Sequence, residues 1–218
     1  MARTRSSKAW LTRHVNDHFV QQSVAKGYRS RAAFKLLAID EKDHLFRRGQ
    51  VVVDLGAAPG SWCQIAREKV GEQGRVFALD LLPMPGLAGV DIVQGDFRED
   101  AVLAELERRL ENRRVDLVIC DMAPNITGSR VTDQARTILL CELALEFAQR
   151  WLRPGGHFLT KIFQGEGFVE FQRLMQPTFA QVVSRKPDAS RDESRELYLL
   201  GKHFKPTSVL AAAVGLEP

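Results

Sequence analysis

The sequence predicts an α/β fold built on one mostly parallel sheet. From residue 50 onward, short apolar runs alternate with longer stretches of helical spacing, which is the pattern of repeated βα units. The runs at 51–53 and 117–119 are continuously apolar, as expected for central strands that are covered on both faces. A glycine-rich turn at 56–60 follows the first run, at the place where open α/β sheets bind nucleotides. We therefore expect a ligand site at the end of the first strand.

Length and composition bound the number of domains and the class of protein. A chain of 218 residues is long enough for one well-buried domain. With 44% hydrophobic and 27% charged residues, a disordered or fibrous protein is excluded. No bilayer-length apolar run and no signal segment is visible, so we expect a cytoplasmic protein without membrane contact. Cys63, Cys120 and Cys141 are an odd number without a CxxC pair, which fits a reducing compartment.

Positive charge is concentrated at the N-terminus. Residues 1–50 hold eleven Lys or Arg and four Asp or Glu, a net charge of +7, whereas the remaining residues have a net charge of −3. We interpret residues 1–49 as a basic helical arm, 50–205 as the main domain and 206–218 as a tail. A cationic arm favours a polyanionic partner, with nucleic acid the leading candidate and a solvated surface or a mitochondrial transit peptide as alternatives.

The elements follow from periodicity and from turn residues. Two helices are expected at about 10–22 and 30–44, separated by a turn at 26–29. Seven strands are expected at 51–55, 75–80, 91–94, 116–121, 157–163, 179–185 and 196–203. A long helix at 132–152 should end in a tight turn at 153–156, where the sequence is RPGG. The last two strands are joined by too few residues for a crossover helix, so they should pair antiparallel.

Acidic residues after successive strands indicate a nucleoside-type ligand. Asp80 follows Gly60 by twenty residues and ends the second strand, where a carboxylate can accept both ribose hydroxyls. Asp96 follows the third strand and is placed to contact an adenine amino group. Neither GxGxxG nor GxxxxGK[ST] occurs, so a ligand without phosphate fits better than a dinucleotide or a nucleoside triphosphate. S-adenosylmethionine is one such ligand.

A second group of residues carries charge into the sheet. Asp121 ends the fourth strand, and Lys161 lies inside the apolar fifth strand, where an unpaired lysine is costly to bury. Asp121 is its natural partner, either for chemistry or as a stabilising ion pair. Glu196 and Lys35 can face the same crevice, although spacing alone does not show it. His14 and His18 have a spacing that can hold a metal, but no third ligand is evident, so no metal site is expected.

The chain resembles the FtsJ family of ribosomal RNA 2'-O-ribose methyltransferases. SRAAFKL, VVVDLGAAPGSW, GDF, DLVICDMAPN, GGHFLTKIF and SRELYLL occur in the order and spacing of that family, over roughly residues 10–205. The resemblance implies a Rossmann-like S-adenosylmethionine-dependent methyltransferase fold, with a seven-stranded sheet whose last strand is antiparallel. It implies a catalytic tetrad of Lys35, Asp121, Lys161 and Glu196. It also implies an S-adenosylmethionine site formed by Gly60, Trp62, Asp80, Asp96 and Asp121.

The implied substrate is a uridine of large-subunit ribosomal RNA, preferentially in the assembled particle, and we expect the enzyme to act as a monomer. Phosphate contacts are expected from Arg29, Arg31 and Lys35. Phe163 and Tyr198 are expected to stack on an unpaired base, with core packing as the alternative for Phe163.

Two roles for Lys161 are left open: a neutral general base, or a charged group that orients and stabilises the 2'-oxygen. The alternative substrates for a 2'-O-methyltransferase are transfer RNA and a messenger cap. The alternative from another class of protein is a non-catalytic ribosome-assembly factor. A nicotinamide oxidoreductase is disfavoured because GxGxxG is missing.

Overall fold

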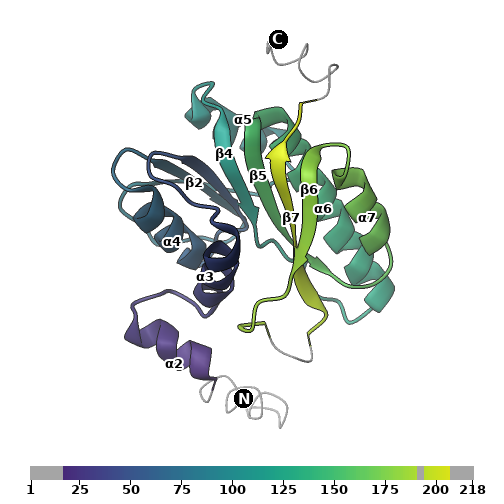
Figure 1. Cartoon of the computed structure of the whole chain (residues 1–218). Helices are drawn as coiled ribbons and strands as arrows, with labels where there is room; N and C mark the ends of the chain where they lie inside the picture. Colours follow the sequence, from purple (N-terminus) through teal and green to yellow (C-terminus); the bar gives the residue numbers. More distant parts are fainter. Residues whose placement is uncertain (1–16, 191–193, 207–218) are drawn as a thin grey trace.

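The computed structural model describes residues 17–190 and 194–206, which form a seven-stranded sheet with helices on both faces (Figure 1). The strand order is β3-β2-β1-β4-β5-β7-β6, and β7 runs antiparallel to both of its neighbours. The strands are β1 Val51–Leu55, β2 Arg75–Asp80, β3 Val90–Gln94, β4 Val115–Cys120, β5 Leu152–Phe163, β6 Phe179–Arg185 and β7 Glu196–Phe204. The predicted seven strands and the antiparallel last strand are confirmed.

Successive residues of the central strands enter two separate cores, as the period of two in a strand requires. Val52 and Leu117 pack with helices α3 and α4, whereas Val53 and Val118 pack with helices α5, α6 and α7. The helices are α2 His18–Ala25, α3 Ala32–Asp43, α4 Ser61–Val70, α5 Asp100–Leu110, α6 Arg130–Trp151 and α7 Phe168–Met175. Coverage of both faces explains why the central strands are continuously apolar. No helix among the described residues has the length and apolarity of a bilayer span.

Helix α3 is joined to the body by its apolar face. Ala33, Leu36 and Ile39 are buried in the same core as β1 and α4. The first predicted helix, 10–22, lies largely outside the described residues, within which α2 begins after Asp17, whose side chain accepts a hydrogen bond from the Phe19 amide. The boundary at residue 49 stays a prediction, but the second helix of the predicted arm shares the core of the body.

The sequence RPGG does not form the predicted tight turn. Helix α6 ends at Trp151 and β5 begins at the next residue, where Leu152 pairs with Val115. The register then shifts between Val115 and Leu117, so that Leu117 pairs with His157. Such a bulge inserts residues into a strand without ending it, and glycine and proline alone do not distinguish it from a turn.

Asp43, the last residue of α3, ties that helix to the far strands. Its carboxylate, 1% exposed, binds Arg185 Nε and Lys202 Nζ, both at 2.6 Å. Burial raises the pKa of Asp43, but the hydrogen bonds from Arg185 and Lys202 outweigh it and lower the pKa overall.

Asp43→Ala is expected to lower the free energy of unfolding by about 3 kcal/mol at pH 7, because it leaves two partly buried cations without their anion. A lowered folded pKa means that this contribution is present above the unfolded pKa and is lost as pH falls through the folded pKa. Urea unfolding at pH 7 and near pH 3 measures both effects. Asp91→Ala removes one of the two acidic partners of the more exposed Arg109, which keeps Glu105, and should cost less than about 1 kcal/mol. An equal loss in both variants would contradict the prediction.

Candidate functional site

The glycine-rich turn is held between the ends of three strands. The Gly56 amide donates to the Leu79 carbonyl at 2.8 Å, and the Asp121 amide donates to the Leu55 carbonyl at 3.0 Å. Gly56 has φ +76°, and a Cβ there would lie 2.6 Å from Met122 Cγ and 2.7 Å from the Met122 amide nitrogen. The close approach of β4 to this turn therefore requires glycine at residue 56.

The two predicted nucleoside carboxylates lie at the same edge of the sheet. Asp80 accepts from the Ala58 amide at 2.8 Å and from the Leu82 amide at 2.7 Å, which fixes it beside the glycine-rich turn. Asp96, after β3, forms a 2.5 Å ion pair with Arg98, and hydrogen bonds from Arg98 lower the pKa of Asp96. Leu81 and Leu82, which the sequence analysis passed over, are 56% and 62% exposed. They offer an apolar surface beside Asp80.

Asp54 is a buried carboxyl that the sequence analysis did not place among the site residues. Its side chain is fully buried, Oδ2 accepts from Cys63 Sγ at 3.0 Å, and Oδ1 has no partner among the described residues. Burial, with repulsion from Asp121 and Asp80, raises the pKa of Asp54 to about 7. An acid inside the apolar run 51–55 was the signal that could have revealed it.

Trp62 lies inside the fold. Its Nε1 donates to the Ala32 carbonyl at 2.8 Å, and its ring packs 5.6 Å from that of Tyr198. Gly60 precedes α4 with φ +104°. Cofactor contacts by Gly60 and Trp62 stay predictions, and Trp62 is 2% exposed.

The four residues of the predicted tetrad come from four separate elements and meet as two ion pairs. Lys161 Nζ lies 3.1 Å from Asp121 Oδ1 and donates to the Asp121 carbonyl at 2.5 Å. Lys35 Nζ on α3 lies 2.5 Å from Glu196 Oε1 on β7. The Tyr198 hydroxyl joins the pairs: it donates to Asp121 Oδ1 at 2.9 Å and lies 3.5 Å from Glu196 Oε1. The predicted Asp121–Lys161 pairing is confirmed.

The charges of this cluster set the protonation of its members. Burial lowers the pKa of Lys161, but the carboxylates of Asp121 and Glu196 outweigh it and raise the pKa overall. Burial and the same two carboxylates raise the pKa of Tyr198 well above its usual range. At neutral pH the cluster therefore presents an ammonium group and a protonated phenol. A cavity of about 270 Å³ opens beside it, with Lys35 and Glu196 in its wall.

The predicted RNA contacts are only partly compatible with the structure. The base-stacking role of Tyr198 is wrong for this structure, because the ring is fully buried; its place on a covered strand, not its aromatic character, determines its role. Arg29 donates to the carbonyls of Pro59, Pro85 and Gly86, and Arg31 pairs with Asp17 and the Ala189 carbonyl.

The guanidinium groups of Arg29 and Arg31 therefore donate hydrogen bonds to the protein itself. The predicted phosphate contacts would use the N–H groups that are not engaged in these hydrogen bonds. Lys35 is likewise paired with Glu196. Phe163 is half-buried at the end of β5, so its contact with a base stays a prediction.

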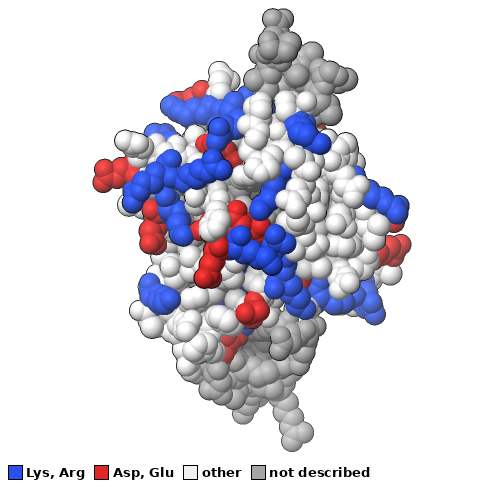
Figure 2. Space-filling model, in the orientation of Figure 1, with Lys and Arg blue, Asp and Glu red and all other residues white. Residues whose placement is uncertain are grey.

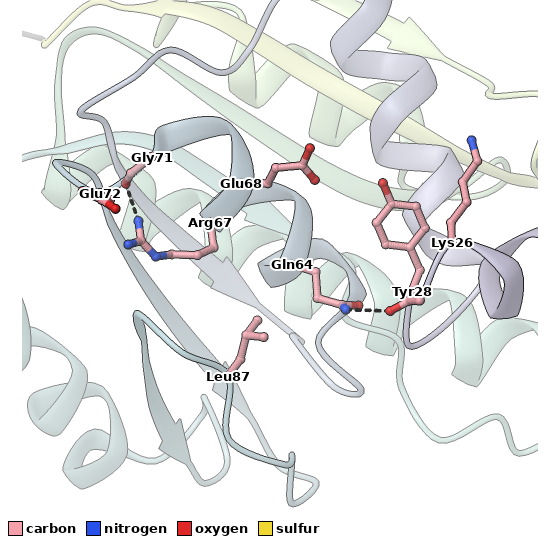
Figure 3. A pocket seen from close by; sticks show the side chains of 9 residues that line it. Lys26, Tyr28, Gln64, Arg67, Glu68, Gly71, Glu72 and Leu87 are labelled. Carbon is pink, nitrogen blue, oxygen red and sulfur yellow. Dashed lines mark hydrogen bonds between the residues drawn. The ribbon is translucent and has the colours of Figure 1, made fainter.

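Two other features lie apart from the cluster. A cavity of about 470 Å³ lies beside α4, where Lys26 and Tyr28 on one side face Gln64, Arg67 and Glu68 on the other (Figure 3). No residue of the predicted sites lines it. His14 lies outside the described residues, and within those that are described no group of three metal-ligating side chains occurs.

Tyr198→Phe is expected to lower kcat roughly tenfold, because it removes one hydrogen bond to the Asp121 carboxylate while retaining the buried ring. Tyr28→Phe is the matched control, since Tyr28 is the chain's other tyrosine and no hydrogen bond from its hydroxyl is found among the described residues. Single-turnover rates of both variants in the reaction that the resemblance implies test this. Equal rates in the two variants would show that the bridge does not position Asp121.

Comparison with known proteins identifies the family. Residues 28–204 match the family described as FtsJ-like methyltransferase. "Ribosomal RNA large subunit methyltransferase E" of Azoarcus sp. is 63% identical over 201 residues, covering 92% of this chain and 98% of that protein. The protein of the same name from Chromobacterium violaceum is 58% identical over 202 residues, covering 93% and 98%.

A solved chain from Plasmodium falciparum, which carries the name of a ribosomal RNA methyltransferase, covers 83% of this chain and 100% of its own length. Its TM-score is 0.74 at 26% identity. The Rossmann-like fold and the resemblance given by the motifs are thereby confirmed. The chain belongs to the FtsJ-like methyltransferase family.

Proposed function

We propose that the protein transfers a methyl group from S-adenosylmethionine to the 2'-oxygen of a uridine ribose in large-subunit ribosomal RNA. The assembled particle is the proposed form of the substrate, and the enzyme acts as a cytoplasmic monomer. The observation that carries the proposal is the paired cluster of Lys35, Asp121, Lys161 and Glu196 beside the glycine-rich turn. The names of the relatives from Azoarcus and Chromobacterium support the choice of ribosomal RNA.

The residues at the turn fit S-adenosylmethionine, which supplies an electrophilic methyl group. Asp80 faces the turn as a ribose ligand, and the exposed side chains of Leu81 and Leu82 offer an apolar surface for adenine. Asp96 contacts the adenine amino group in this proposal. The unpartnered Oδ1 of Asp54 is a buried acceptor below the turn, which suits a cationic ligand.

Lys161 acts in this proposal as a charged group that orients the acceptor. A ribose 2'-hydroxyl is a very weak acid, so attack requires either removal of its proton or stabilisation of charge on its oxygen. Asp121 and Glu196 raise the pKa of Lys161, which supports the second route. The ammonium would donate a hydrogen bond to the 2'-oxygen, whose bond to the methyl carbon forms as the methyl–sulfur bond breaks, and the hydroxyl proton would pass to water. Lys35 and Glu196 then position the ribose and the neighbouring lysine.

The pH dependence of single-turnover transfer distinguishes the two roles of Lys161. With a raised pKa, Lys161 is charged throughout pH 6–9, so we expect no ionisation of a lysine near neutrality in the pH profile of the single-turnover rate. A general base would instead give a rate that rises tenfold per pH unit below a depressed pKa and then levels. Asp54, whose pKa is about 7, is the group most able to mimic such a rise. Asp54→Asn therefore serves as the control: a rise that persists in this variant belongs to Lys161 and would contradict the charged role.

Labelled methyl transfer to undermethylated large subunits tests the proposal, with naked ribosomal RNA, transfer RNA and capped RNA in parallel and Lys161→Ala as control. Label recovered in an alkali-resistant dinucleotide at a uridine, and abolished by the substitution, is the expected result. A preference for transfer RNA or capped RNA would show that the substrate is that RNA and not ribosomal RNA. Cofactor binding without transfer to any RNA would overturn the enzymatic assignment in favour of an assembly factor.

A further inference from the structure

Basic side chains line the edge of the sheet where the parallel strands begin, opposite the tetrad. Figure 2 shows Lys and Arg gathered over the upper end of the molecule, where β4 and β5 begin in Figure 1. We call the following residues the amino-edge patch: Arg47, Arg48, Arg75, Arg153, Lys202 and Lys205. They lie before β1, at the start of β2, in the first residues of β5, near the end of β7 and after it. Five of the six are exposed, and Lys202 is half-buried.

Several cations of the patch lie close to two histidines. His157 and His203 lie side by side on β5 and β7, with ring centroids 5.1 Å apart, and the His203 amide donates to His157 Nδ1. Burial lowers the pKa of His157 to about 4, and the charges of Arg47, Lys202 and Arg153 contribute to this shift. Cations from three separate segments, Arg47, Arg153 and Lys202, therefore lie close enough to act on a single imidazole.

Most of this positive charge is not neutralised within the protein. Arg153 pairs with Asp116, and Lys202 pairs with Asp43. Arg47, Arg48, Arg75 and Lys205, in contrast, have no carboxylate partner among the described residues. Arg75 lies instead 5.9 Å from the centre of the Phe77 ring. A row of exposed, uncompensated guanidinium and ammonium groups is the arrangement that binds a phosphodiester backbone.

We propose that the amino-edge patch binds the backbone of a second segment of the RNA substrate, remote from the nucleotide that is methylated. The inference rests on the proposed action on RNA. His157 at this edge and Lys161 at the tetrad are four residues apart on β5, which corresponds to about 13 Å along the strand. The reacting nucleotide does not reach both. An RNA that contacts both edges must continue beyond the reacting nucleotide and pass around the sheet, so the patch favours a long substrate over a short hairpin.

The test compares two triple variants with the same change in charge. The patch variant removes three cations that have no carboxylate partner among the described residues, by the substitutions Arg47→Gln, Arg48→Gln and Lys205→Gln. The control variant removes three exposed arginines from α5, α6 and α7, by the substitutions Arg108→Gln, Arg136→Gln and Arg173→Gln. Methyl transfer is measured on large subunits, on naked ribosomal RNA and on a short hairpin that carries the acceptor nucleotide. RNA affinity is measured separately by filter binding over a range of salt concentrations.

The patch variant is expected to raise KM for subunits and for naked ribosomal RNA at least about tenfold, with kcat and S-adenosylmethionine affinity unchanged. The slope of log affinity against log salt should decrease by about 2, at about 0.7 per lost phosphate contact. The short hairpin should be methylated equally by the patch variant, the control and the parent.

Equal affinities of the patch variant and the control for long RNA would overturn the inference. If the patch variant binds naked RNA normally and loses affinity only for assembled subunits, the patch contacts a ribosomal protein and the inference is wrong. If the parent chain methylates no RNA, the proposed function fails, and the salt dependence of binding still decides whether the patch contacts RNA.

Discussion

Lys161→Met is expected to lower kcat by about 10³-fold while leaving S-adenosylmethionine affinity within about threefold. Methionine keeps an unbranched apolar chain one atom shorter than lysine but removes the ammonium that lies 3.1 Å from Asp121 Oδ1. Loss of one preorganised donor to a developing negative charge costs an enzyme roughly 10²–10³ in rate. A further loss follows here because Asp121 loses the cation with which it pairs.

Single-turnover transfer and equilibrium binding of the methyl donor separate the two effects. Lys69→Met is the matched control: Lys69 also pairs with an acid, Asp40, at 2.8 Å, but it lies on α4 away from the tetrad. Glu196→Gln should cost less, about tenfold, because Glu196 pairs directly with Lys35 and acts on Lys161 only through its charge. A Lys161→Met variant with normal kcat would refute the role given to this residue. A parallel loss of donor binding would place Lys161 in the cofactor site instead.

Periodicity was sufficient for most of the fold. Apolar runs located the central strands because strands covered on both faces have no polar face to obscure them, and shorter apolar segments located the edge strands β3 and β6. The strand order and the bulge in β5 were not visible, since pairing partners are chosen by packing between distant segments rather than by local spacing. The same limit applies to α3: its apolar residues were visible in the sequence, but their packing into the core of the body was not.

The site was predictable where a residue breaks its local pattern. Lys161 is a charge inside an apolar strand, which required a partner, and Asp121 proved to be that partner. An aromatic residue such as Tyr198 is ordinary in a strand. The sequence therefore did not show whether its ring is exposed or whether its hydroxyl lies buried between two carboxylates. Arg29 shows the converse: its charge suggested phosphate, but backbone carbonyls of the adjacent loop already accept its hydrogen bonds.

The glycine-rich turn leads to the second large effect. Gly56→Ala is expected to lower the free energy of unfolding by about 4 kcal/mol and S-adenosylmethionine affinity at least about tenfold. Two costs add: φ +76° is unfavourable for a residue with a Cβ, by about 1–2 kcal/mol, and crowding against Met122 adds about 1–3 kcal/mol. Met122 cannot easily retreat, because Asp121 beside it is fixed through its amide to Leu55 and through its carboxylate to Lys161.

Gly155→Ala separates the two costs, because Gly155 has nearly the same φ, +79°, and a methyl group added there would meet no atom within 4 Å. This control should lose only about 1–2 kcal/mol and keep its affinity for the methyl donor. Urea unfolding and isothermal titration with S-adenosylmethionine measure the pair. Equal losses would mean that backbone conformation alone requires glycine at residue 56. A larger loss at Gly56, with weakened donor binding, would show that the close approach of β4 to the turn also shapes the cofactor site, and that strain at the turn is transmitted to Asp121.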